Sequence, residues 1–159
     1  EFESGASVDG WEGKGSRLNV TEFARSWTLQ MGFPLLTVKR GKDENLVTVT
    51  QQRFKLDPDA KDPEQYRDPE YGFEWYVPVW YQMQSDAAHN VHFQWLTPSD
   101  KSSAVKSSSI QLSVPAEDWI LVNPDVRAYY RVMYDQENYD RLAELLRSND
   151  TTMACLTQP

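Results

Sequence analysis

The chain has 159 residues, a formal net charge of −8 and one cysteine. This length is sufficient for one domain with a real core, and the acidic residues are spread along the chain without a basic stripe, which argues against nucleic-acid binding. No apolar run approaches the roughly 18 residues that span a membrane, and the N-terminus lacks a signal-peptide pattern. We therefore expect no membrane contact by this segment.

Apolar residues make up 40% of the chain and aromatic residues 13%. Most Trp and Tyr residues fall in short runs that look like strands, so the composition indicates a folded, β-rich protein. The single Cys155 excludes an internal disulfide. We interpret it as an inert apolar residue, while a free thiol and half of a bridge to a missing partner stay open.

Two Asn-x-Thr triplets make Asn19 and Asn149 possible glycosylation sites. Such triplets also arise by chance. They favour an extracellular protein or a plasma-membrane ectodomain, and a cytoplasmic location stays open.

The first predicted helix covers residues 19–33. Asn19 caps it, and Glu22 lies three residues further on, in the position of a capping box. Gly32 is placed for a left-handed C-terminal cap, and Phe33 is placed to fold back onto the last turn. The apolar stripe consists of Phe23, Trp27 and Met31.

Strands follow the first helix, because Pro34 prevents the helix from continuing. Strands predicted at 35–40 and 46–54 flank the sequence GKDEN and form a hairpin. Residues 57–72 contain three Asp-Pro pairs, which predict a long surface loop.

The sequence WYVPVWYQM alternates and predicts a strand, with Pro78 indicating an edge strand or a bulge. One face carries Trp75, Val77, Val79 and Tyr81, and the other carries Tyr76, Pro78, Trp80 and Gln82. The sequence VHFQWL predicts a strand with Val91, Phe93 and Trp95 inward and His92 and Gln94 outward.

Three more strands are predicted in IQLSV, WILVN and AYYRVMYD. About seven short strands separated by turns are typical of a mainly β fold, a two-sheet antiparallel β-sandwich, here with an N-terminal and a C-terminal helix. Asp135 caps the second helix. The faces that we expect to be apolar consist of Ile110, Leu112 and Val114 in the strand and Tyr139, Leu142, Leu145 and Leu146 in the helix.

No motif in the chain completes an active site. His89 and His92 lack the glutamate and the helical spacing of a zinc helix, so we interpret them as solvent-facing strand residues. Residues 13–16, GKGS, have no strand before them and indicate a linker rather than a phosphate loop. Glu117 and Asp118 lie in a turn and are expected to be solvated. Cys155 has no upstream His in a catalytic spacing.

The aromatic residues permit a second function, a free-standing extracellular module that binds a protein or a glycan. It would use the loop 57–72 or stack sugar rings on the aromatic face. Their alternating placement favours core packing instead. The aromatic residues concerned are Trp75, Tyr76, Trp80, Tyr81 and Trp95.

Four separated motifs, in this order, resemble the aminopeptidase N-type zinc metallopeptidases. They are SWTLQMGFPLLTV, VTVTQQRFKLDP, WYVPVWY and WILVNPDVRAYYRVMYDQENYDRLAELL. The resemblance extends from Asn19 to Arg147. It implies a β-sandwich that follows the catalytic domain of a multidomain exopeptidase, which removes N-terminal residues from peptides with one zinc ion.

The resemblance implies no catalytic or metal residue in this chain, because the family's zinc helix, distal Glu ligand and substrate loop have no counterpart here. The zinc ion is therefore expected in the parent protein only. The matching residues are implied to be structural joints between domains. The N-terminal joint contains Trp27, Gln30, Gly32, Phe33 and Pro34, and the C-terminal joint contains Asn123, Tyr129, Tyr130, Arg131, Tyr134 and Asp135.

The chain departs from the family at Ala128, usually Gly, and at Met133, usually Asn. The parent is thus expected to be a zinc aminopeptidase or an inactive homologue. Its expected partners are the flanking domains, with a peptide substrate only in the full-length protein and no nucleic acid. The expected divisions are 1–18, a flexible lead-in or artificial tail; 19–33, a helix that ends the catalytic domain; 34–134, the sandwich; and 135–159, the start of a C-terminal helical domain.

Overall fold

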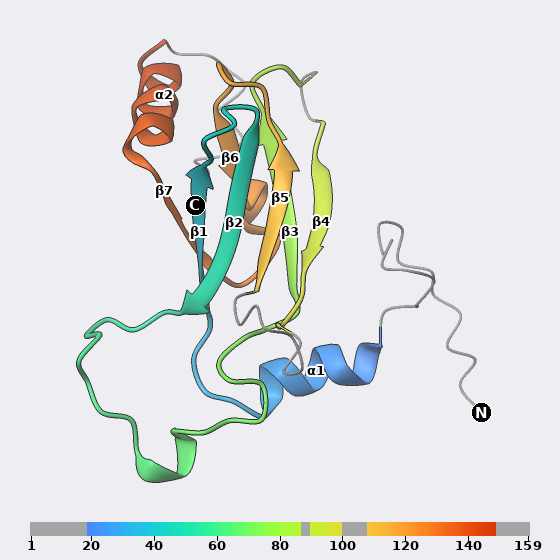
Figure 1. Ribbon diagram of the computed structural model, residues 1–159, viewed down its shortest axis with the longest axis vertical. Coiled ribbons are helices and arrows are strands. Elements are labelled where there is room, and N and C mark those ends of the chain that lie inside the picture. The colour runs from blue at the N-terminus through green and yellow to red at the C-terminus, as the bar shows by residue number, and fades with distance from the viewer. Residues whose placement is uncertain (1–18, 87–89, 100–107, 149–159) are drawn as a thin grey trace.

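A computed structural model describes residues 19–86, 90–99 and 108–148 of the chain. Over these residues, seven strands form two sheets, with one helix near each end of the sandwich (Figure 1). The fold class predicted from the sequence is confirmed. The lead-in 1–18, His89, Asn149 and Cys155 lie outside the described residues, so the predictions made for them stay predictions.

The four-stranded sheet has the order β5-β2-β1-β7. The hairpin between β1 and β2 is confirmed, with Pro34 opposite Arg53 and Arg40 opposite Val47. One pair departs from the expected antiparallel sheet, because β7 runs parallel to β1. The strands are β1 (Pro34–Arg40), β2 (Leu46–Arg53), β5 (Ser109–Ser113) and β7 (Arg131–Tyr134).

The three-stranded sheet has the order β4-β3-β6, with β3 (Val77–Met83) between β4 (His92–Leu96) and β6 (Ile120–Val122). Strand β3 is therefore a central strand, whereas Pro78 indicated an edge strand or a bulge. However, β6 pairs only with residues 81–83 of β3, and β4 pairs with residues 77–81. Pro78 thus lies where β3 has a neighbouring strand on one side only. Proline is tolerated there because its missing N–H group leaves no ladder hydrogen bond unmade on the open side.

The core lies between the two sheets, where alternate residues of each strand meet. Trp75 lies two residues before β3 and is 0% exposed. The buried side chains from the four-stranded sheet and the residue after β5 are Leu36, Val38, Val47, Val49, Leu112 and Val114; those from the three-stranded sheet are Val77, Val79, Leu96, Ile120 and Val122.

The inward face predicted for β4 is wrong. Val77 lies opposite Leu96 in the register, and Trp80 lies opposite Phe93. Directly opposed residues share one face of a sheet, so Leu96 joins the core with Val77. Phe93, and with it Trp95, lies on the outer face of the three-stranded sheet.

Helix α1 (Val20–Thr28) ends earlier than predicted, and residues 29–32 form a bend. Gly32 has a positive φ of 91°, but it lies beyond the helix and is not its cap. Asn19 is the N-cap as predicted: its side chain accepts hydrogen bonds from the N–H groups of Thr21 and Glu22.

Helix α2 (Gln136–Arg147) begins after its predicted cap, Asp135. The apolar stripe expected along it is only partly buried, because Leu142 packs inward while Tyr139 and Leu146 are 42% and 51% exposed. Asn138, four residues before Leu142, occupies the inward face instead.

The predicted loop 57–72 contains no strand, only the short 3-10 helix η1 (Glu64–Tyr66). A second 3-10 helix, η2 (Pro124–Val126), follows β6. Among the described residues, neither α1 nor α2 has the length and apolar character that crossing a membrane requires.

Candidate functional site

The residues predicted as joints gather where α1 and α2 meet the sandwich. At the N-terminal joint, the side-chain amide of Gln30 contacts the backbone ahead of β3. Its Nε2 donates to the carbonyl oxygens of Glu74 at 2.7 Å and Ser26 at 2.8 Å, and its Oε1 accepts from the N–H of Phe73 at 3.0 Å. Because α1 ends at Thr28, Gln30 lies in the bend, where it can reach both segments.

Trp27 adds an apolar contact beside Gln30. Its ring lies 6.2 Å from the ring of Trp75, and its Nε1 donates to the carbonyl oxygen of Tyr76 at 3.0 Å. Phe23, one turn earlier in α1, meets Trp95 edge-on at 5.7 Å. Helix α1 is therefore held by aromatic packing as well as by hydrogen bonds.

Gly32 is required where Arg53 passes the backbone. A Cβ atom at Gly32 would lie 2.9 Å from Nε of Arg53, and the positive φ disfavours any other residue. The guanidinium of Arg53 binds both carboxylate oxygens of Asp62, at 2.7 and 3.0 Å, and lies 4.3 Å from the ring centre of Phe73. The hydrogen bond from Arg53 lowers the pKa of Asp62.

Residues from both predicted joints meet around Phe33. Its ring stacks on Phe54 at 5.2 Å and contacts the edge of Tyr129 at 5.1 Å, rather than folding back onto α1 as predicted. The guanidinium of Arg131 lies 4.4 Å from the centre of the Phe54 ring. The buried Pro34 starts β1 immediately after this cluster.

At the C-terminal joint, Asn123 organises the turn between β6 and β7. It adopts a left-handed conformation with φ 64°. Its amide donates to the carbonyl oxygen of Ala128 at 2.9 Å and accepts from the N–H of Ala128 at 3.0 Å. Ala128 itself does not have a positive φ, so alanine fits where the family usually has glycine. Met133 is exposed on the outer side of β7.

Tyr134 and Asp135 connect β7 to α2. The hydroxyl of Tyr134 accepts from the N–H of Val122 at 2.8 Å, and burial raises the pKa of Tyr134. Burial also raises the pKa of Tyr130, which lies in the core. Asp135 accepts from the N–H groups of Asn138 and Arg40, both at 2.9 Å, so one carboxylate caps α2 and ties it to β1.

Asn138, whose N–H donates to the predicted joint residue Asp135, was not predicted from the sequence. It is 6% exposed, and its amide both donates to and accepts from the backbone of Ile120 in β6, each at 2.9 Å. An Asn among polar residues near a helix start gives no periodic signal. Its spacing of four from Leu142 was the only clue.

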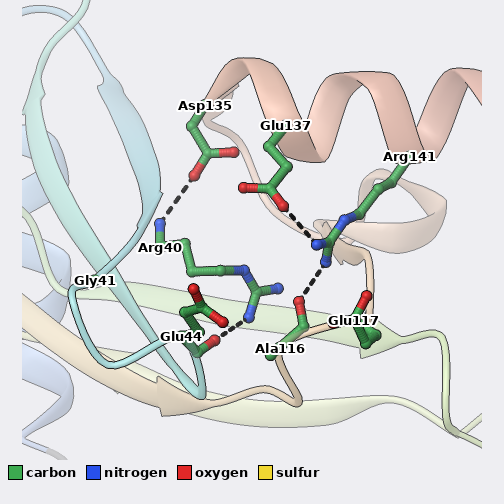
Figure 2. A pocket seen from close by; sticks show the side chains of 8 residues that line it. All are labelled: Arg40, Gly41, Glu44, Ala116, Glu117, Asp135, Glu137 and Arg141. Atoms are coloured by element: carbon green, nitrogen blue, oxygen red, sulfur yellow. Dashed lines mark hydrogen bonds and ion pairs between the residues drawn. The ribbon is translucent and has the colours of Figure 1, made fainter.

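A polar pocket of about 480 Å³ lies between α2, the β1–β2 turn and the loop after β5 (Figure 2). Arg141 donates to the carbonyl oxygens of Ala116 at 2.6 Å and Asp118 at 2.9 Å, and to Glu137 at 2.6 Å. Arg40 donates to the carbonyl oxygen of Asp118 at 2.7 Å. Both guanidinium groups therefore bind backbone, which makes the pocket part of the C-terminal joint. The pocket is lined by Arg40, Gly41, Glu44, Ala116, Glu117, Asp135, Glu137 and Arg141.

The predictions that Asp118 is solvated and that His92 faces solvent both need correction. Asp118 is 8% exposed rather than solvated, and its carboxylate accepts from the N–H of Ser85 at 2.9 Å, while Glu117 is exposed as expected. His92 is not simply solvent-facing, because its Nε2 lies 2.7 Å from the carboxylate of Asp86.

Within the described ranges, no three His, Cys, Asp or Glu residues are grouped so that they could hold a metal ion. The donors present there do not fit a zinc site.

The aromatic residues lie in two different places, the core and the outer face of the three-stranded sheet. Trp75 lies in the core, as predicted. Trp80, however, lies on the outer face, where its ring is 4.4 Å from that of Phe93, and Phe93 meets Trp95 edge-on at 5.3 Å. These rings pack on one another, which favours a packing role over an open platform for sugars.

No family model matches the chain, whereas curated aminopeptidases do. It is 34% identical over 143 residues to aminopeptidase N of Haemonchus contortus, covering 89% of this chain and 13% of the relative. It is 30% identical over 139 residues to human aminopeptidase N, covering 87% and 13%. With rat glutamyl aminopeptidase the identity is 31% over 151 residues, covering 94% and 14%.

The chain thus spans only about a seventh of the length of these curated relatives. Nearly all of its described residues fall within the matched region, including both helices and all seven strands described. Over the segment that it covers, this chain belongs to the aminopeptidase N-like family.

Proposed function

We propose that this chain is the non-catalytic β-sandwich of a zinc aminopeptidase-like protein. Its role is to set the position of a catalytic domain, which precedes α1, relative to a helical domain, which begins with α2. The parent protein would remove N-terminal residues from peptides with a zinc ion held by another part of the polypeptide. The family relationship supports the parent's activity, and the geometry of the joints supports the role of this segment.

The observation that carries the proposal is a repeated contact at the two helices. In each joint, one side-chain amide both donates to and accepts from the sandwich backbone. These amides belong to Gln30, which follows α1, and to Asn138 in α2. The two helices lie near opposite ends of the sandwich (Figure 1). A contact with both a donor and an acceptor fixes rotation as well as distance.

A rigid sandwich whose helices have fixed directions can hold the two flanking domains in one relative position and orientation. Interdomain contacts within a chain often permit motion, so a defined arrangement requires joints that resist rotation. Each joint here also has a second kind of contact. Trp27 packs on Trp75 at the N-terminal joint, and Asp135 binds Arg40 at the C-terminal joint.

The test uses the full-length protein with Asn138→Ala, and Gln136→Ala as the matched control on the same helix. We expect Asn138→Ala to lower kcat/KM for an aminoacyl substrate while the zinc content stays at the wild-type level. Equal kcat/KM in the wild-type and Asn138→Ala proteins would contradict the proposed role. A loss of zinc would mean that the substitution acts on the metal site instead.

The second part of the proposal concerns the chain by itself. We expect the purified 159-residue chain to hydrolyse no aminoacyl substrate and to bind no stoichiometric zinc. Zinc-dependent hydrolysis in pure material would refute the non-catalytic role. We also propose that the parent is extracellular or a plasma-membrane ectodomain, which surface labelling of intact cells can test.

A further inference from the structure

The loop 57–72 is ordered by polar contacts, because its sequence offers little material for a core. It contains no Val, Ile, Leu, Met, Phe or Trp. A segment of this composition buries too little apolar area to offset the entropy that is lost when it is ordered. Its arrangement must therefore come from contacts with neighbouring elements. The loop carries six acidic residues, Asp57, Asp59, Asp62, Glu64, Asp68 and Glu70.

The first of these contacts is made by Asp62, in the middle of the loop. The guanidinium of Arg53, at the end of β2, binds both carboxylate oxygens of Asp62, and Nε of Arg67 donates to the carbonyl oxygen of Asp62 at 2.8 Å. Arg53 also passes the backbone of Gly32, in the bend that follows α1. The middle of the loop is thus tied to β2 and, through Arg53, to this bend.

The second contact joins the end of the loop to the polar face of α1. Glu22 and Arg25 lie three residues apart and therefore share one face of the helix. Arg25 donates to the carboxylate of Glu70 at 2.8 Å, and the hydroxyl of Tyr71 donates to the carboxylate of Glu22 at 2.6 Å. The hydrogen bond to Glu22 raises the pKa of Tyr71, so the hydroxyl remains a donor at neutral pH.

We propose that residues 57–72 form an ionic strap that braces α1 against β2 and opens as the ionic strength rises. Figure 1 shows this loop leaving the end of β2 and returning beside α1. The inference rests on the proposed function, in which the direction of α1 fixes the position of the catalytic domain. It adds a condition under which that direction is less firmly held.

The two contacts of the strap differ in their sensitivity to salt. The pair of Arg53 and Asp62 is bidentate, and its side chains are only 12% and 18% exposed, so salt screens it little. The ion pair of Arg25 and Glu70 lies at the periphery of α1 and is screened more strongly. The strap therefore opens first at α1, with Asp62 as the pivot.

Opening of the strap leaves α1 in place but less constrained. The packing of Trp27 on Trp75 does not depend on charge, so it persists when the strap is open. The N-terminal joint thus combines a contact that salt does not weaken with one that salt does weaken.

The test is limited trypsin digestion of the full-length protein, with cleavage between Arg67 and Asp68 followed by mass spectrometry. Cleavage requires the strap to open, because the side chain of Arg67 is bound to Asp62 in the closed strap. The wild-type rate should rise about threefold between about 0.05 M and about 0.5 M NaCl, after correction for the rate on the denatured protein in the same salt.

Arg25→Gln and Glu70→Gln should each raise the rate about threefold at the lower salt concentration and reduce its dependence on salt. The double variant should match either single variant, because both substitutions break the same contact. The matched control is Arg127→Gln, which breaks another exposed ion pair, to Asp125 at 3.2 Å, and should keep the wild-type rate.

Equal rates at low salt in the wild-type and Arg25→Gln proteins would overturn the inference, as would a wild-type rate that does not rise with salt. Equal acceleration by Arg127→Gln would also overturn it, because the cleavage would then report a general loss of stability. Cleavage at Arg67 does not depend on catalysis. The strap can therefore fail this test while the kcat/KM of Asn138→Ala still supports domain positioning, and the reverse outcome is equally distinguishable.

Discussion

The two joints share one kind of contact, a side-chain amide that both donates to and accepts from the backbone, but its surroundings differ. At the N-terminal joint, the half-buried Gln30 lies beside aromatic rings, with Trp27 packing on Trp75. At the C-terminal joint, Asn138 is buried and is accompanied by polar contacts, among them Asp135 to Arg40. The first helix is thus held largely by apolar area, and the second largely by hydrogen bonds to backbone groups.

This difference shows which substitutions should harm each joint. A buried polar group that loses its partner costs more than a half-buried one, because water cannot replace the partner. The C-terminal joint should therefore be the more sensitive to loss of its amide. The N-terminal joint should retain part of its stability through the contacts of Trp27.

The largest effect is expected from Asn138→Ala. It leaves the N–H and C=O of Ile120 without their partner in a buried position, at a cost of about 3 kcal/mol in the free energy of unfolding. Urea unfolding measures it as a lower midpoint at an unchanged slope. The control Gln136→Ala, at an exposed position of the same helix, should stay within about 0.5 kcal/mol of the wild type. Equal midpoints for the two variants would contradict the comparison.

Gln30→Ala should cost less, about 2 kcal/mol, because water can reach part of the backbone that it uncovers. The matched control is Gln52→Ala, an exposed amide on β2. The same urea experiment should place Gln30→Ala between this control and Asn138→Ala. A greater loss for Gln30→Ala than for Asn138→Ala would reverse the ranking of the joints.

Tyr134→Phe should cost about 1 kcal/mol at neutral pH, through the lost hydrogen bond to Val122. Burial raises the pKa of Tyr134, so the neutral phenol stabilises the fold below pH of about 10 and this contribution is lost as the pH rises further. The variant should therefore lose less stability than the wild type in alkaline solution. Parallel alkaline profiles would refute this role, and Tyr130 is expected to leave a residual slope in both.

The smallest effect is expected from Asp62→Asn. The hydrogen bond from Arg53 lowers the pKa of Asp62, so the carboxylate stabilises the fold above its unfolded pKa of about 3.9 and less as the pH falls below it. The unfolding midpoint of the wild type should therefore decrease more steeply below about pH 4 than that of Asp62→Asn. Asp59→Asn, an exposed site in the same loop, serves as the control and should keep the wild-type slope.

Alternation along the sequence predicted the strands and the core of β3, because Trp75, Val77 and Val79 face one way whatever their neighbours are. It failed for β4, because its strongest apolar residues, Phe93 and Trp95, lie on the outer face. The face of β4 is set by its register with β3, which puts Leu96 in the core. That register depends on contacts between strands, and a single strand's pattern does not contain it.

The resemblance named the residues predicted as joints but none of their contacts, and their role between domains stays a prediction. Gln30 and Asp135 belong to recognisable motifs, whereas Asn138 and Arg40 act by reaching backbone groups far away in sequence. Such contacts leave no periodic signal. The parallel pairing of β7 with β1 was missed for a related reason, since alternation is the same for both strand directions.

The central claim is that the sandwich fixes the geometry of the domains on either side. The most direct measurement is a pulsed EPR distance distribution between spin labels on the two flanking domains of the full-length protein. The wild type and Gln136→Ala should give one narrow distribution, and Asn138→Ala and Gln30→Ala should each give a broader one. Distributions of equal width in all four proteins would contradict the account.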